Sequence, residues 1–267
     1  VAHRANLVTR DFLGMKMINA VLAFVDWVAT KRRQVSYRRF LASHHPDAKT
    51  RRIPKPSETR WLYYRDVVCS ILSQTSFIEA FLNENDEFKA FWSGLGMDAE
   101  KYGPCVEHDF SLNRGLFLTT FRFTSFVLEF LGRVNTVFQE QYSTIAQLWD
   151  IVEAMKVSIK SWAVMLSLGN TTEFPCLSQM DDRQMKLFQN IVEQLLHSVE
   201  MRFPCPTSSV DMKRKRPRTG QSTSQQEQTA LALSCSIRTQ LEFMEFPDDI
   251  INFQLFPTNF PSFFIEE

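Results

Sequence analysis

Apolar residues recur along much of the chain at steps of three and four residues, the spacing that places side chains on one face of an α-helix. The first clear stripe consists of Ile18, Val21, Leu22, Val25 and Val28. The pattern predicts an amphipathic helix in this region, with the stripe facing a core.

The same spacing predicts further helices downstream. We expect helices over about 59–81 ending at Asn83, around 88–92, over 123–138 and 148–166, and from Asp181 to before Pro204. Asn83 and Gly169-Asn170 suit the left-handed turn after a helix, and Gly94 and Gly96 stop the short helix before them. Thr144 with Gln147 fits a reciprocal N-terminal cap. Acidic Asp181 and Asp182 suit a positive helix N-terminus.

The character of the chain changes after Pro204. Residues 205–229 are rich in Pro, Ser, Thr, Gln and basic residues and have hardly any apolar ones, so we expect a disordered basic linker. Residues 230–267 regain a helical stripe through Ile237, Leu241 and Met244. With no alternating strand pattern and no repeat, the prediction is an all-α, multi-helix domain of roughly six to eight helices.

Composition narrows the possible classes. The 267 residues include 24 Phe but only 8 Gly, which disfavours hairpin-rich folds and phosphate-cradling loops. The 5 Cys are far apart and form no C-x-x-C pair, so a disulfide framework and a zinc knuckle are not expected. No apolar run approaches the roughly 20 residues of a membrane span, and we expect no membrane contact. The chain begins with Val1 rather than Met, which suggests an excerpt from a longer protein.

The formal net charge of zero conceals strong local charge. Residues 30–65 hold eleven basic and two acidic residues, giving +9, whereas 78–109 hold eight acidic and two basic residues, giving −6. Residues 241–267 add six acids and no base. Such local fields, rather than net charge, decide which partner approaches.

We interpret the +9 stretch as a candidate contact with nucleic-acid phosphates. Tyr37, Trp61, Tyr63 and Tyr64 are possible stacking partners for bases. The alternative is a solvated face that is partly neutralised by the −6 segment packed nearby. The candidate nucleic-acid-binding residues are Arg32, Arg33, Arg38, Arg39, Arg51, Arg52, Lys55, Arg60 and Trp61.

A second basic run lies inside the predicted linker and is flanked by Pro and Ser. Its residues are Lys213, Arg214, Lys215, Arg216 and Arg218. Such a run is typical of a nuclear import signal, and the alternative is a solvated linker.

Catalytic motifs are not found. No His pair has metal-ligand spacing with a carboxylate, and no G-x-S-x-G, P-loop or H-E-x-x-H motif occurs. Glu107, His108 and Asp109 are adjacent and are interpreted as a loop surface. We expect no metal site and no catalytic residue, and we assign the Phe stripes to the core.

Two segments resemble a known family. The chain starts with Ala2-His3-Arg4-Ala5-Asn6-Leu7-Val8-Thr9-Arg10-Asp11, and Glu58-Thr59-Arg60-Trp61-Leu62 follows about 55 residues after His3, with one long helix expected between them. Their order and spacing resemble the hAT superfamily of DNA transposases and the domesticated genes derived from it. Phe126–Asn135 and the stretch from Gln139 to Trp162 are similar to zinc-finger BED-type and related transposon-derived proteins.

The resemblance implies that residues 1–57 end an RNase H-like core with its lead-in helix, and that 58–204 form a helical insertion domain. Residues 205–229 and 230–267 are then the basic linker and a C-terminal helical segment. Active hAT enzymes hold Mg²⁺ with two Asp and one Glu for strand transfer. The family pattern places both Asp before Val1, and its Glu motif is not found before Glu267, which implies no catalytic residue and no cofactor in this chain. The chain also lacks the family's BED zinc finger.

Trp61 occupies the position at which the transposases handle DNA flanking the cut, although the alternative is a core anchor. We therefore expect a nuclear, transposon-derived fragment that binds DNA or protein and is catalytically inactive alone. One alternative is a slice of an active DNA transposase. Another is a protein-interaction scaffold with no nucleic-acid role. DNA and a second copy of the chain, forming a homodimer, are the partners considered.

Overall fold

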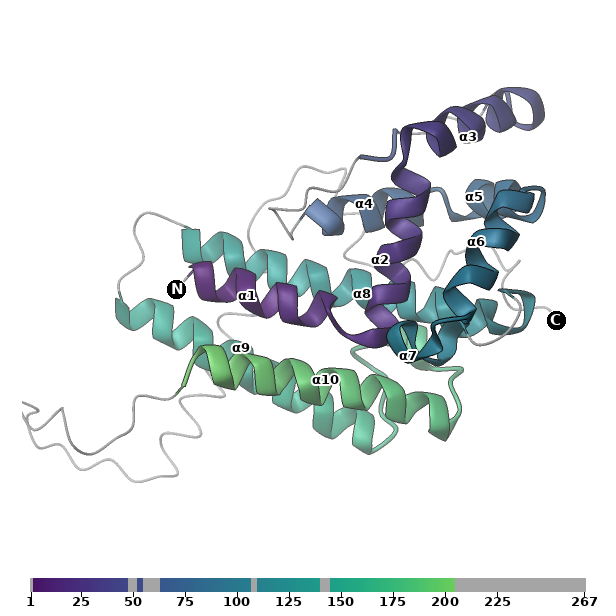
Figure 1. Ribbon diagram of the computed structural model, residues 1–267. Helices are drawn as coiled ribbons and strands as arrows, with labels where there is room; N and C mark the ends of the chain where they lie inside the picture. The colour runs from purple at the N-terminus through teal and green to yellow at the C-terminus, as the bar shows by residue number, and fades with distance from the viewer. Residues whose placement is uncertain (1, 48–51, 55–62, 107–109, 140–144, 205–267) are drawn as a thin grey trace, which may run out of the picture. The chain divides into compact units, whose positions relative to one another are not determined.

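The computed structural model describes residues 2–47, 52–54, 63–106, 110–139 and 145–204 (Figure 1). This part of the chain is all-α, with ten α-helices, two short 3-10 helices and no strand. The predicted fold class is therefore confirmed. All of the described helices belong to one compact unit.

The elements follow one another along the chain in a simple order. They are α1 (Ala2–Leu13), α2 (Lys16–Ala29), α3 (Lys31–His44), α4 (Tyr63–Leu72), α5 (Thr75–Asn83), α6 (Asp86–Gly96), α7 (Ala99–Tyr102), η1 (Pro104–Val106), α8 (Phe110–Gln139), α9 (Ile145–Ser167), η2 (Pro175–Leu177) and α10 (Asp182–Arg202).

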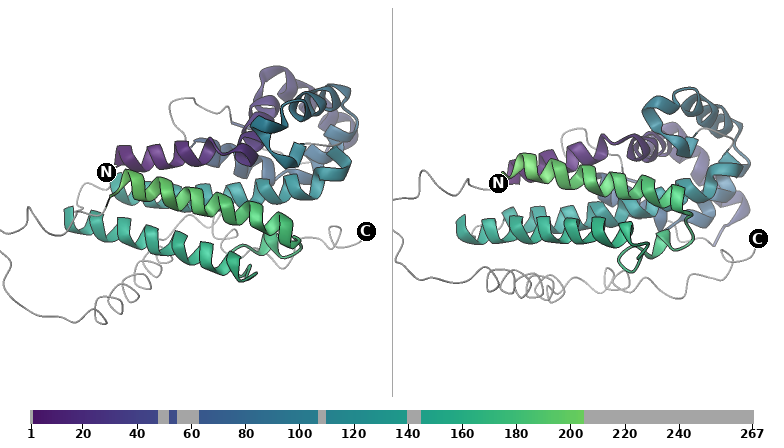
Figure 2. Two further views of the ribbon diagram at one scale, coloured as in Figure 1. Left: turned by 60° about the horizontal axis from the view of Figure 1, so that its bottom comes forward. Right: turned by 90° about the horizontal axis from the view of Figure 1, so that it is seen from below.

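Four helices form the frame of this unit. Figure 2 shows α1, α8, α9 and α10 running alongside one another, and α1 packs on both α8 and α10 while α10 packs on α9. Asp11 of α1 joins α10 directly, because its carboxylate accepts hydrogen bonds from Ser198 at 2.8 Å and from Arg202 at 2.9 Å. The first helix of the chain thus packs against the last one.

The many phenylalanines form two aromatic clusters along α8. In its first half, Phe117 meets Phe24 and Trp92 edge-on, with ring centroids 5.4 and 5.0 Å apart. Near the middle of α8, Phe123 lies 5.1 Å from Phe174 and also from Phe188. Edge-to-face pairs stabilise a core beyond the burial of their area, so the Phe content is explained by packing.

The helical stripes predicted from the sequence are largely confirmed. Ile18, Val21, Val25 and Val28 of α2 are buried, and Leu22 is partly buried. The start of α10 carries a capping box in which Gln184 N donates to Asp181 Oδ1 at 2.7 Å.

The ends of the helices were predicted less accurately than their buried faces. Gly169 has φ +69° just beyond α9, as expected of a left-handed terminator. The helix ends at Asn83 as predicted, but the left-handed turn expected of Asn83 is wrong, because Asn83 is still helical and Glu84 after it has φ −92°. Gly94 lies inside α6 rather than beyond it, and the helix continues to Gly96.

The single long helix expected between the two transposase-like segments is wrong. The chain turns by 91° between α1 and α2 at Gly14–Met15, and breaks again at Thr30, whose ψ of 143° is extended. The helix expected over 59–81 is also interrupted, at Ser73 and Gln74, between α4 and α5. These breaks raise the helix count above the six to eight expected.

One described helix, α8, is long and apolar enough to cross a membrane, and α1 with α2 passes the same criterion only as a bent pair. The most apolar stretch of α8 is 61% buried inside the unit. A core helix surrounded by other helices has this composition too.

Several predictions fall outside the described residues. They are the linker 205–229, the C-terminal segment 230–267, the cap at Thr144, the loop at 107–109 and the start of the helix at Thr59.

Candidate nucleic-acid interface

Helix α3 concentrates the positive charge of the N-terminal part of the chain. It carries Lys31, Arg32, Arg33, Arg38 and Arg39 and no acidic residue. Its opposite face is anchored, because Gln34, Tyr37 and Leu41 are buried. The anchored face fixes which side of α3 meets solvent.

The outward face holds two rows of cations. At 100° per residue, positions seven apart return to nearly the same side of a helix, so Lys31 aligns with Arg38 and Arg32 with Arg39. Lys31, Arg38 and Arg39 are exposed, and none of them forms an ion pair with a residue that the structure describes.

A neighbouring segment adds a fourth cation. Gln34 Nε2 donates to the carbonyl oxygens of Ala29 at 2.9 Å and of Ile53 at 3.0 Å, which holds residues 52–54 beside α3. Ile53 is buried and Arg52 next to it is exposed. We call Lys31, Arg38, Arg39 and Arg52 the α3 cationic surface.

Arg32 and Arg33 have a different environment, since both pair with Glu87 near the start of α6. Arg33 Nη1 lies 2.8 Å from Glu87 Oε2, and Arg32 Nη2 contacts Glu87 Oε1. The Arg33 guanidinium also lies 4.9 Å from the ring centroid of Trp27. The neutralising effect that the alternative interpretation ascribed to the acidic segment is thus present at these two arginines.

A further contact follows the same pattern at the end of α3. His44 Nε2 lies 3.8 Å from Glu84 Oε2, which makes an ion pair only when the imidazole is protonated. The acidic segment therefore touches both ends of α3 and leaves the middle of its outer face uncovered.

The aromatic residues expected to stack on bases are wrong at two positions. Tyr37 is 5% exposed and Tyr64 is 8% exposed. Burial raises the pKa of Tyr37 to about 12, and the Tyr64 hydroxyl donates to Asp26 Oδ1 at 3.2 Å. Both rings are packed between helices. The sequence did not indicate this, because its pattern does not distinguish a buried tyrosine from an exposed one.

Several other candidate residues lie outside the described part of the chain. They are Arg51, Lys55, Arg60, Trp61, and the proposed import signal Lys213, Arg214, Lys215, Arg216 and Arg218. The side chain of Tyr63 lies outside it as well. Of the nine nucleic-acid candidates, Arg38, Arg39 and Arg52 are exposed, and Arg32 and Arg33 pair with Glu87.

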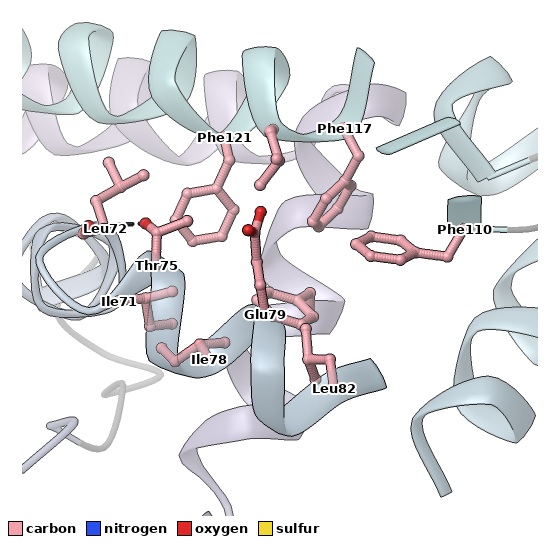
Figure 3. Close-up of a pocket in the computed structure, with 11 residues that line it drawn as sticks. Ile71, Leu72, Thr75, Ile78, Glu79, Leu82, Phe110, Phe117 and Phe121 are labelled. Atoms are coloured by element: carbon pink, nitrogen blue, oxygen red, sulfur yellow. Dashed lines mark hydrogen bonds between the residues drawn. The ribbon is translucent and has the colours of Figure 1, made fainter. Parts of the chain in front are cut away.

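A second candidate site, which the sequence did not indicate, is a small pocket between α5 and α8 (Figure 3). Phe24, Phe117 and Phe121 line it, and Glu79 points its carboxylate toward the helix that carries the last two rings. Glu79 Oε2 accepts a hydrogen bond from Arg114 at 2.7 Å, whereas its buried Oε1 has no hydrogen-bond partner among the described residues.

This pocket is too small to bind an organic molecule. It measures about 20 Å³, which is room for one water molecule and not for an organic substrate. Among the described residues, no group of three His, Cys, Asp or Glu side chains could hold a metal ion. We therefore treat Glu79 as a buried charge of the core.

The described thiols are also poor nucleophiles. Burial raises the pKa of Cys176 to about 11 and raises that of Cys69. The thiolate is the reactive form of cysteine, so both side chains remain neutral near pH 7. The α3 cationic surface is left as the candidate site with the clearest chemistry.

Comparison of the chain with protein-family models, with curated proteins and with solved structures finds no match. The likeness to hAT transposases accordingly depends on the sequence segments that carry it.

Proposed function

We propose that this protein binds DNA through the phosphate backbone, using the α3 cationic surface. The observation that carries the proposal is the absence of any acidic partner, among the described residues, for the four exposed cations Lys31, Arg38, Arg39 and Arg52. Cations without an internal partner attract phosphates and release the counterions condensed on them.

The spacing of the surface suits a phosphate strand. Lys31 and Arg38 are seven residues apart and so lie about 10 Å apart along the helix axis. One strand of duplex DNA presents a phosphate every 3.4 Å or so along its axis, so these two side chains span about three phosphates.

Zero net charge does not oppose this contact. At about 0.1 M salt, exposed charges farther apart than roughly 10 Å are largely screened from one another. A phosphate at the middle of α3 therefore experiences Arg38 and Arg39 more strongly than acidic residues on distant helices.

The proposed contact does not read bases. The exposed and half-exposed residues of α3 besides its cations are Val35, Ser36, Phe40, Ala42, Ser43 and His44. Asn and Gln, which recognise adenine through paired hydrogen bonds, are absent from this face, where Gln34 is buried. Arginine can recognise guanine, but the contacts proposed here are with phosphates, which carry no sequence information directly. We therefore expect similar affinities for duplexes of different sequence.

The resemblance to hAT transposases also favours DNA binding, because in that family the Trp at the position of Trp61 handles DNA beside the cut; it assigns no such role to α3. Under this proposal the protein is a transposon-derived DNA-binding segment, and residues 2–204 bind without cutting.

The proposal is tested by fluorescence anisotropy of a labelled DNA duplex titrated with the full chain at several salt concentrations. Four phosphate contacts predict a slope of about −3.6 for log K against log salt. Substituting Arg38→Gln and Arg39→Gln together should flatten the slope to about −1.8.

A matched control removes two charges elsewhere. Arg183 and Lys186 are exposed on α10, and replacing both by Gln changes the net charge equally. This variant should keep the wild-type slope. No binding at low salt, or equal losses in both double variants, would contradict the proposal.

A further inference from the structure

Glu87 holds two arginines that differ in how firmly they are fixed. The Arg33 side chain is 18% exposed, and its guanidinium lies against both Glu87 and Trp27. Trp27 is itself stacked on Phe91, with ring centroids 5.3 Å apart. Arg33 is thus built into the junction of α2, α3 and α6.

Arg32 is the loosely held partner. Its side chain is 75% exposed, and among the described residues Glu87 is its one ion-pair partner. Exposed ion pairs are weak because water solvates both groups. Breaking this pair is therefore easy if another anion takes the place of the carboxylate.

Arg32 is also in the right place to meet the same anion as the α3 cationic surface. It lies about two helical turns before Arg39 on the same side of α3, and it follows Lys31 directly in the sequence. A phosphate presents the same geometry to a guanidinium as a carboxylate does, since both accept two parallel N–H hydrogen bonds.

We infer that Glu87 is an internal competitor of DNA phosphate for Arg32. This inference rests on the proposed DNA binding and adds its regulation. In the wild type Glu87 retains Arg32 and keeps it from the phosphates. Without the Glu87 carboxylate, Arg32 becomes a fifth phosphate contact, while Arg33 keeps its contact with Trp27. Glu87 thereby limits the affinity of the surface for DNA.

The inference is tested in the full chain with two charge-matched substitutions in the first turn of α6. Glu87→Gln removes the competitor. Asp86→Asn removes an equal charge one residue earlier, where Asp86 pairs with Lys89 on its own helix at 3.0 Å. Circular dichroism melting of both variants shows whether α6 and the unit remain folded.

Anisotropy titrations with a DNA duplex then compare affinity and salt dependence. We expect Glu87→Gln to bind about two- to fivefold tighter than wild type, the factor that corresponds to one weak exposed ion pair. Its log–log salt slope should be steeper by about 0.9, because Arg32 now releases a counterion of its own. Asp86→Asn should change neither quantity by as much.

Adding Arg32→Gln to the Glu87→Gln variant should return both affinity and slope to wild-type values. Equal behaviour of Glu87→Gln and Asp86→Asn, with wild type binding DNA normally, would overturn the competition and leave the proposed function intact. Absence of DNA binding in every variant would instead overturn the proposed function.

Discussion

Two glycines of α6 have opposite surroundings although they are two residues apart. A Cβ at Gly96 would lie 2.7 Å from the carbonyl oxygen of Val106, a backbone atom of η1 that cannot move independently. A Cβ at Gly94 would meet nothing within 4 Å. The close approach of α6 to η1 therefore requires glycine at 96 and not at 94.

Substituting each glycine by alanine tests this contact. Gly94→Ala should raise the free energy of unfolding by about 0.5–1 kcal/mol, because alanine restricts the unfolded chain more than glycine does and favours a helix. Gly96→Ala should lower it by about 1–3 kcal/mol through overpacking. Urea denaturation gives both values, and equal effects would refute the packing at η1.

Glu79 offers a second contrast at the residue scale. Its carboxylate is held by Arg114, and its other oxygen is buried with no hydrogen-bond partner in the described part of the chain. Arg114→Met should destabilise the protein by about 1–3 kcal/mol, because the buried carboxylate loses its partner. Glu79→Met should be neutral or stabilising, because Arg114 is 44% exposed and remains solvated. Greater loss in the Glu79 variant would contradict this account.

At the scale of elements, the sequence could predict which faces are buried but not where helices break. The stripe of α2 could be predicted because burial follows the helical period, and the start of α10 because the acidic Asp181 and Asp182 suit a positive helix N-terminus. The helix breaks at Thr30 with no proline or glycine there, so the local sequence did not indicate the break. The two Glu87 ion pairs join residues 55 and 54 positions apart, and only the tertiary fold brings them together.

The anchoring of α3 on α5 gives a pH-dependent prediction. Burial raises the pKa of Tyr37 from 10.0 to about 12 in the folded protein. The folded state therefore favours the neutral phenol, and this stability is fully present below pH 10 and is lost as the pH rises toward 12. Denaturation at pH 9 and pH 11 should show a larger loss of stability for wild type than for Tyr37→Phe, and equal losses would contradict it.

At the scale of the whole molecule, the balance of 30 basic and 30 acidic residues conceals a local surface of exposed cations that have no acidic partner in the part of the chain that the structure describes. The neutral average arises partly from contacts such as those of Glu87, which cancel charge where two helices meet. The four residues of the α3 cationic surface do not pair with Glu87. Their position explains how a neutral chain could attract DNA.

The basic run at residues 213–218 leads to a separate prediction about location. Replacing Lys213, Arg214, Lys215 and Arg216 by Gln in a fluorescently tagged chain should shift the protein from nucleus to cytoplasm, because import signals are recognised by their charge. The Arg183 and Lys186 double variant serves as the control. An unchanged distribution would refute nuclear import through this run.

The central claim is that DNA contacts the outer face of α3, and the most direct measurement is an NMR titration of the isotope-labelled chain with a DNA duplex. Our account predicts that the largest shifts occur in the amide and arginine side-chain signals of Lys31–His44 and Arg52, and that they weaken together as salt is added. Binding that shifts signals on α9 and α10 while leaving α3 unchanged would contradict it.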